Sequence, residues 1–156
     1  MASEPFEMKE RGPALEPGAI ERLESALGSS LPTEYREFLA ATNGGRTPKS
    51  QRTFTAGRAG QVALNQLHSL DSPRSPLQSD GWRPDWIPTE LLPIGSASGG
   101  IVALCLRGEH AGSVWYLDTA DARPEGSNPR VLWHDRRDFA RVGDSFNAFL
   151  ASLGPL

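Results

Sequence analysis

Apolar positions near the start of the chain recur at the spacing of a helix. Over residues 17–27, one predicted face carries Ile20, Leu23 and Leu27. Gly28 follows, and glycine readily takes the left-handed conformation that ends a helix. The pattern therefore predicts a short amphipathic helix over residues 17–27.

A second helical pattern follows after a short polar link. Pro32 suits a first helical position, because the N–H that proline lacks would be unpaired there. Tyr35, Phe38 and Leu39 fall at i, i+3 and i+4 and form one apolar stripe. Asn43-Gly44-Gly45 supplies residues that can end this helix. Two helices with so tight a link are expected to pack against each other.

The middle of the chain alternates between apolar runs and turn residues, which favours strands. Residues 101–107 are almost continuously apolar, as in a central strand, and residues 113–117 form a predicted returning strand after a glycine-containing turn. Residues 53–55 and 131–133 predict two further short strands. A further apolar stretch consists of Val62, Ala63 and Leu64 with Leu67 and Leu70, and its period assigns it neither to a helix nor to a strand.

Two polar stretches, residues 72–84 and 120–129, predict surface loops. A last helix is predicted by apolar residues at helical spacing, namely Phe146, Phe149, Leu150 and Leu153. Asp144 or Ser145 can cap its free N–H groups, and Gly154-Pro155 ends it. This order predicts the α+β class: a single domain with two N-terminal helices and a C-terminal helix packed on a mostly antiparallel central sheet.

The beginning of the chain differs from the rest. Residues 1–16 are rich in charges and contain Gly12-Pro13, so we expect a loose leader there. The remaining residues, 17–156, have the length of one domain.

Several segments, in their order along the chain, resemble the SUKH superfamily, the Smi/Knr-type immunity proteins of bacterial toxin systems. They are LPTEYREFLAATNGG at residues 31–45, LLPIG at 91–95, the small-residue turn at 98–100, the hairpin residues 102–106 and 112–118, and SFNAFL at 145–150. The resemblance extends over residues 17–153. One departure is that the family usually has an acidic residue before the Gly-Gly turn, where this chain has Ser96-Ala97-Ser98.

Composition narrows the function classes. The net charge of −3 disfavours a nucleic-acid partner, which is normally bound by a basic face. No apolar run approaches the roughly 20 residues that span a bilayer, and the start of the chain lacks the pattern of a secretory signal. With a single cysteine there is no disulfide framework. These features predict a cytoplasmic protein that binds neither membranes nor nucleic acid directly.

The chain lacks the motifs of common catalytic and metal sites. His68, His110 and His134 have no metal-type partner at the usual spacing, so we expect no metal and no cofactor. The turn at residues 95–100 has alanine at the centre of its Gly-x-Ser-x-Gly frame and lacks the lysine of a phosphate loop. Cys105 lies in an apolar run and is expected to be a small core residue. We therefore expect no catalytic residue and no enzymatic activity.

Aromatic and acidic side chains cluster on predicted loops and on the hairpin, a composition that suits a protein–protein contact. The candidate partner-binding residues are Asp80, Trp82, Asp85, Trp86, Trp115, Asp118 and Asp121. The alternative for Trp86 and Trp115 is that their rings cap the core. A separate group of arginines, Arg130, Arg136, Arg137 and Arg141, alternates with aspartates and indicates a salt-bridged or solvated face.

The family resemblance implies a cytoplasmic immunity protein that binds a cognate polymorphic toxin domain, for example a nuclease, and neutralises it by occlusion. Two alternatives remain open. One is a non-catalytic regulatory or scaffold module with a cellular partner. The other is a small hydrolase that uses Ser98 or Asp118, which requires a base about 3 Å from the serine hydroxyl.

Overall fold

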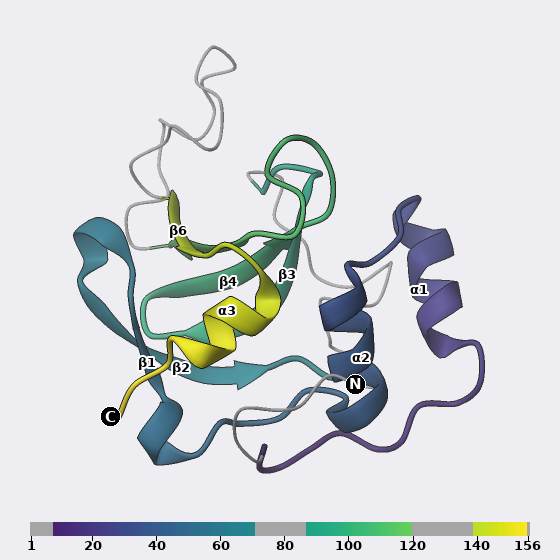
Figure 1. The fold of residues 1–156 in the computed structure, drawn as a ribbon, viewed down its shortest axis with the longest axis horizontal. Coiled ribbons are helices and arrows are strands. Elements are labelled where there is room, and N and C mark those ends of the chain that lie inside the picture. Colours follow the sequence, from purple (N-terminus) through teal and green to yellow (C-terminus); the bar gives the residue numbers. More distant parts are fainter. Residues whose placement is uncertain (1–7, 71–86, 120–138, 156) are drawn as a thin grey trace.

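The computed structural model describes residues 8–70, 87–119 and 139–155. The helices in these residues are α1 (Ala19–Leu27), α2 (Thr33–Thr42) and α3 (Phe146–Ala151), with two short 3-10 turns, η1 (Lys49–Gln51) and η2 (Gly57–Ala59). The strands are β1 (Thr53–Thr55), β2 (Gln61–Leu67), β3 (Leu91–Ala97), β4 (Gly100–Cys105), β5 (Val114–Asp118) and β6 (Phe139–Gly143). Figure 1 shows their arrangement.

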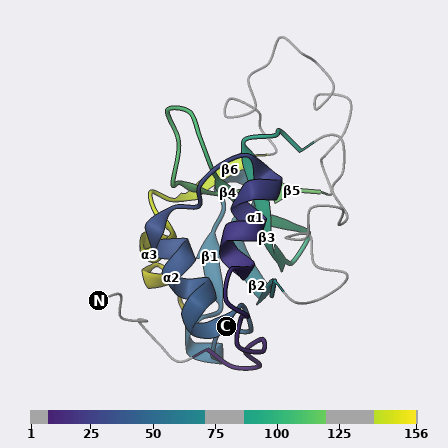
Figure 2. The ribbon, with the colours of Figure 1, turned by 90° about the vertical axis from the view of Figure 1, so that its right-hand side faces the viewer.

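The strands form one six-stranded sheet in the order β1-β2-β3-β4-β5-β6, and every neighbouring pair is antiparallel. Each described strand therefore pairs with the next one along the chain. The helices α2 and α3 lie on the same side of the sheet (Figures 1 and 2). The predicted α+β domain with three helices on an antiparallel sheet is confirmed.

An aromatic cluster joins α2 to α3. The Tyr35 and Phe38 rings of α2 meet the ring of Phe146 edge-to-face, at centroid distances of 5.1 and 4.9 Å. The Glu34 carboxylate accepts a hydrogen bond from the backbone N–H of Asn147 at 2.8 Å, and the Ser145 hydroxyl accepts one from Ala148 at 3.1 Å. The predicted serine cap is thus confirmed, and α2 supplies a second acceptor for the free N–H groups of α3.

The ends of the first two helices follow the sequence pattern closely. Gly28 ends α1 with φ +68°, and Asn43 ends α2 with φ 48°, both in the left-handed region. Pro32 lies one position before the helix, as the residue that flanks its first turn. The sequence predicts Pro32 at the first helical position. At either position the N–H that proline lacks would have no partner within the helix, so its absence costs no helical hydrogen bond.

Asn43 connects three segments. Its side-chain amide donates to the Pro13 carbonyl at 2.9 Å and accepts from the backbone N–H of Leu70 at 2.8 Å. Its own carbonyl accepts from Gly12 N–H at 3.2 Å. Because Asn43 is only 2% exposed, these bonds satisfy polar groups that water does not reach. The end of α2 is therefore a junction as well as a helix stop.

The predicted leader is partly packed on the domain. Lys9 and Arg46 form an antiparallel bridge with two backbone hydrogen bonds of 2.6 Å, and the Met8 side chain is buried. Gly45, with φ +122°, lies so close that a Cβ there would sit 2.5 Å from the Lys9 carbonyl oxygen. The boundary between a loose leader at residues 1–16 and a domain at residues 17–156 stays a prediction. Residues 8–13 are nevertheless held against the fold.

The central strands are buried on both faces. On β4, Val102 and Leu104 belong to the main core beneath the helices, whereas Ile101, Ala103 and Cys105 belong to a second cluster. Residues 101–106 are continuously apolar because both faces of this strand are buried. The Cys105 thiol donates to the Arg107 carbonyl at 3.2 Å, and burial raises the pKa of this thiol. Its predicted role as a small core residue is confirmed.

At its outer side, β1 contacts the segment after α3. The Gly154 carbonyl accepts from the N–H groups of Arg52 and Thr53, and Gly154 N–H donates to the Thr53 carbonyl. The predicted strand at residues 53–55 is confirmed, and the unassigned stretch 62–70 contains most of β2, which begins at Gln61. The strand β6 was not predicted. The predicted strand at 131–133 and the predicted loops at 72–84 and 120–129 lie outside the described residues.

Candidate interaction surface

Two of the seven candidate partner-binding residues, Trp115 and Asp118, lie in the described part of the chain, both on β5. The other five, Asp80, Trp82, Asp85, Trp86 and Asp121, lie outside it. The grouping of all seven residues on one surface therefore stays a prediction.

Trp115 is a core residue of β5. It is 5% exposed and belongs to the second hydrophobic cluster with Leu91, Ile101 and Phe139. Its indole N–H donates to the Ser113 hydroxyl at 2.7 Å. The buried indole contacts two polar groups nearby, Ser113 and His110.

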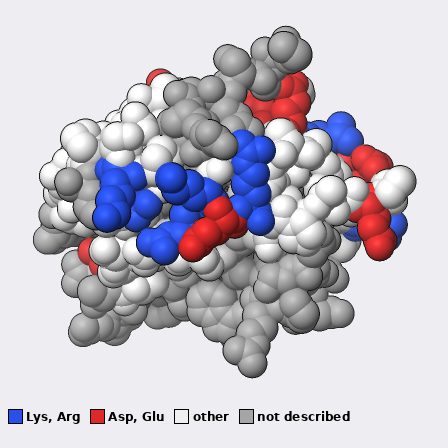
Figure 3. Space-filling view, turned by 90° about the horizontal axis from the view of Figure 1, so that it is seen from below, with Lys and Arg blue, Asp and Glu red and all other residues white. Residues whose placement is uncertain are grey.

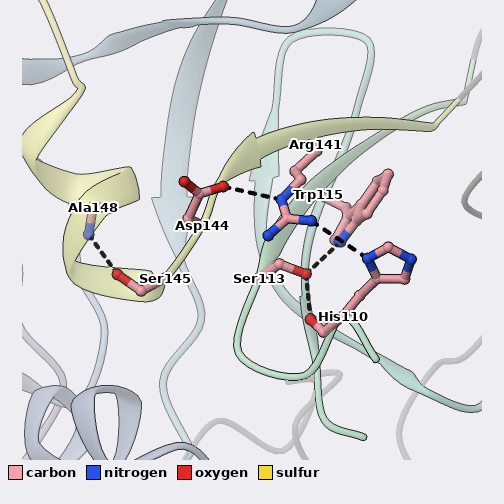
Figure 4. Close-up of polar contacts among 7 residues, drawn as sticks. All are labelled: His110, Ser113, Trp115, Arg141, Asp144, Ser145 and Ala148. Atoms are coloured by element: carbon pink, nitrogen blue, oxygen red, sulfur yellow. Dashed lines mark hydrogen bonds and ion pairs between the residues drawn. The ribbon is translucent and has the colours of Figure 1, made fainter. Parts of the chain in front are cut away.

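Those groups form a polar cluster around the loop between β4 and β5 (Figure 4). The His110 ring lies edge-to-face against Trp115, with centroids 5.7 Å apart, and the Ser113 hydroxyl donates to the His110 carbonyl. Arg141 on β6 reaches the His110 ring at 3.4 Å and forms an ion pair with Asp144 at 3.1 Å. The expected local salt bridge of the arginine group is thus confirmed for Arg141, whereas Arg130, Arg136 and Arg137 lie outside the described residues.

Asp118 lies on the opposite face of β5 from Trp115, because residues three apart on a strand point to opposite sides. It is half-buried and pairs in register with Gly100. On the same face, the Tyr116 hydroxyl donates to the Ser98 carbonyl at 2.7 Å. Burial, and secondarily the charge of Asp118, raise the pKa of Tyr116. The structure therefore separates the two described candidates onto two faces of the sheet.

Ser98 and Gly99 form the two-residue turn between β3 and β4, in which Gly99 takes φ +72°. The Ser98 side chain is exposed at this turn. Within the described residues its hydroxyl makes no hydrogen bond to a basic side chain, so nothing there activates it as a nucleophile. In the same part of the chain, no three His, Cys, Asp or Glu residues are grouped as metal ligands.

The structure also brings together cations that the sequence separates. We use the name basic patch for Lys9, Arg11, Arg46, Lys49 and Arg52. Lys9 and Arg46 are neighbours through their backbone bridge, and Arg52 donates to the carbonyl and hydroxyl oxygens of Thr47 at 3.1 and 3.2 Å. Figure 3 shows Lys and Arg side chains gathered across this side of the molecule.

The basic patch is not apparent from the sequence, because residues 9–11 lie in the predicted loose leader. The signal that could have located it is the Asn43-Gly44-Gly45 turn. Two successive glycines with φ +83° and +122° leave room for another backbone to approach. Nothing in the sequence identified residues 8–13 as that backbone.

Comparison with known families gives a match that covers most of the chain. The model of the SMI1 / KNR4 family (SUKH-1) matches residues 14–152. The chain belongs to the SMI1/KNR4 family. The resemblance to this family is thereby confirmed. Its segments form α2 with the Asn43 junction, the strands β3, β4 and β5, and α3; they are residues 31–45, 91–95, 98–100, 102–106, 112–118 and 145–150. A search of curated proteins returned no match.

In the described residues of this SMI1/KNR4 protein, every helix is too short or too polar to cross a bilayer.

Proposed function

We propose that this protein is a bacterial immunity protein that binds a cognate polymorphic toxin domain in the cytoplasm and neutralises it by occlusion. The observation that carries the proposal is the match of the SMI1/KNR4 family over residues 14–152. Residues 31–45 and 145–150 resemble the immunity proteins of this family, and such proteins act by binding.

The proposed mechanism requires no bond to be made or broken on this chain. An inhibitor of this kind covers the active site of its target or the approach to it, typically with about 1,600 Å² of buried surface in total. A surface presented by a packed sheet changes little on binding, which keeps the entropic cost of association low. The six-stranded sheet, buried on both faces at β4, is a scaffold of that type.

We place the toxin contact at the predicted loop residues Asp80, Trp82, Asp85, Trp86 and Asp121, together with Asp118 at the end of β5. Trp115 completes the proposed set from the opposite face of β5, where its ring contacts Ser113 and His110 near the start of the strand. A nuclease is one toxin class that acidic loops suit, because its substrate-binding face is basic.

The test is co-expression with the toxin domain encoded beside this gene. We expect the protein to restore growth and to co-purify with the toxin. The triple variant Trp82→Ala/Asp85→Ala/Asp118→Ala is expected to weaken the complex at least tenfold in Kd, as loss of central aromatic and charged contacts does. Glu37→Ala is the matched control, since Glu37 is exposed on α2 and makes no ion pair with a described residue.

Failure of the wild-type protein to bind the toxin or to restore growth would overturn the immunity proposal. Co-purification of a different cellular protein, without rescue, would instead favour a regulatory or scaffold module. An unchanged Kd in the triple variant would leave the function standing and remove these residues from the contact.

A further inference from the structure

The described charges of this acidic protein are unevenly distributed. The basic patch holds five cations, Lys9, Arg11, Arg46, Lys49 and Arg52, and one carboxylate, Glu10, which approaches Arg46 at 3.8 Å. The two N-terminal helices and the residues just before them carry the opposite excess. There, five glutamates stand against two arginines: Glu16, Glu21, Glu24, Glu34 and Glu37 against Arg22 and Arg36.

The patch is built on fixed backbone. Residues 9 and 46 are joined by two backbone hydrogen bonds of 2.6 Å, and the next residue, Thr47, is 1% exposed. The Arg52 guanidinium is oriented by Thr47, and the Arg11 side chain donates to the Met8 carbonyl at 3.3 Å. Two of the five side chains are therefore already ordered, which reduces the entropy lost when a partner binds.

The two lysines differ from the arginines. Lys9 and Lys49 are exposed, and neither makes a hydrogen bond or ion pair through its side chain with a described residue. Their charges therefore serve no internal contact in this part of the chain. Such charges act mainly at longer range, by attracting an oppositely charged surface.

We propose that the basic patch is a docking surface for an acidic face of the partner protein. The inference rests on the proposed function for the identity of that partner, the toxin domain, and adds that the toxin carries a cluster of Asp and Glu residues where it meets residues 9–11 and 46–52. Charges at such a rim raise the association rate more than they lower the dissociation rate.

A protein partner fits the patch better than a nucleic acid does. The whole chain has a net charge of −3, so a long polyanion that extends past the patch would come within about 10 Å, one Debye length, of a surface that repels it. Glu10 lies inside the patch and would face a phosphate track directly. An acidic protein face has a limited extent and can place a cation opposite Glu10.

The experiment compares two charge-reversed variants of the full chain against the toxin domain encoded beside the gene. Lys9→Glu/Lys49→Glu changes the patch by four charge units without removing a described side-chain contact. Arg22→Glu/Arg107→Glu changes the net charge equally, at exposed positions outside the patch, and is the charge-matched control. It also removes the Arg22–Glu16 ion pair at 3.9 Å and the Arg107 hydrogen bond to the Thr89 carbonyl at 3.1 Å. Association and dissociation rates are measured at low and high salt, and a DNA duplex and an RNA duplex of about 20 base pairs serve as probes for nucleic-acid binding. Thermal unfolding checks that both variants fold.

We expect the patch variant to associate roughly tenfold more slowly than wild type at low salt, with its dissociation rate nearly unchanged. The control should stay within about twofold of wild type, and the difference between the two variants should shrink as salt rises. Equal association rates for both variants, or faster association of the patch variant, would overturn the acidic-face proposal while leaving toxin binding intact. Nucleic-acid binding by wild type that the patch variant loses would overturn it in favour of a phosphate-binding surface. Wild-type protein that does not bind the toxin would overturn the proposed function and this inference together.

Discussion

A single hydroxyl in the core is the clearest residue-scale anomaly. Tyr35 is 1% exposed, and its ring packs against the rings of Phe38 and Phe146. Its hydroxyl has no hydrogen-bond partner among the described residues. Burial raises the pKa of Tyr35 well above its ordinary value, so the group stays neutral. A buried hydroxyl without a partner loses its bonds to water on folding and gains none in return.

We therefore expect Tyr35→Phe to leave the free energy of unfolding unchanged or to raise it by up to about 1 kcal/mol. Tyr116→Phe is the matched control, because the Tyr116 hydroxyl donates to the Ser98 carbonyl at 2.7 Å. Its removal should lower the free energy of unfolding by about 1 kcal/mol. Urea unfolding of the two variants measures the difference. A loss in Tyr35→Phe as large as in Tyr116→Phe would mean that the Tyr35 hydroxyl has a partner after all.

At the scale of elements, the junction after α2 depends on glycine for space as well as for conformation. Gly28 and Gly45 both have positive φ, at +68° and +122°. A Cβ at Gly28 would meet nothing within 4 Å, whereas one at Gly45 would meet the Lys9 carbonyl oxygen at 2.5 Å. The two positions therefore separate backbone strain from steric exclusion.

Gly28→Ala is expected to lower the free energy of unfolding by about 1 kcal/mol, the cost of a left-handed alanine. Gly45→Ala should lower the free energy of unfolding by about a further 1–3 kcal/mol, because the segment that contains Lys9 must move away. Hydrogen exchange at the Lys9 and Arg46 amides should also accelerate in Gly45→Ala and stay unchanged in Gly28→Ala. Equal losses in the two variants, with no change in exchange, would show that the close approach at Gly45 is relieved at no cost.

Elements with local signals were predictable, and elements that depend on irregular pairing were not. The helices α1, α2 and α3 each carry an apolar stripe and a recognisable end residue. The strand β2 could not be assigned from the sequence, because a register shift between Leu64 and Gln66 interrupts the alternation of buried and exposed side chains. A similar shift beside Pro93 lets a proline sit within β3, where its missing N–H would otherwise break the ladder.

The candidate site was less predictable than the fold. Strand alternation alone could have separated Trp115 from Asp118, since they are three residues apart on a predicted strand. The basic patch could not be found in this way, because it needs the pairing of Lys9 with Arg46 across 36 intervening residues. Contacts between distant segments depend on how the sheet and the helices assemble. The local sequence of each segment does not indicate which distant segment it contacts.

For the whole molecule, we expect stability to decrease at mildly acidic pH because of His68, which lies at the end of β2. Its backbone N–H donates to the Ile94 carbonyl at 2.8 Å, and burial lowers the pKa of its imidazole. In the unfolded chain the imidazole keeps its ordinary pKa of about 6.5. Between the lowered pKa and this value the unfolded state binds more protons, so stability falls as the pH drops below about 6.5.

Unfolding free energies of wild type and His68→Gln, measured from pH 8 to pH 5, test this expectation. The wild-type protein should lose stability below about pH 6.5, and the Gln variant, which has no imidazole at this position, should lose less over the same range. Parallel curves for the two proteins would assign the acid sensitivity to other groups.

The bonds between Gly154 and β1 have a consequence for how the molecule behaves among its own copies. An outermost strand with unused N–H and C=O groups is a template on which a second chain can add, and the growth of cross-β aggregates begins there. Here the backbone groups of Arg52 and Thr53 on that side are already occupied by Gly154. Deleting residues 154–156, which keeps the buried Leu153, should therefore promote fibrillar aggregation, which links the sequence after α3 to the solubility of the folded protein.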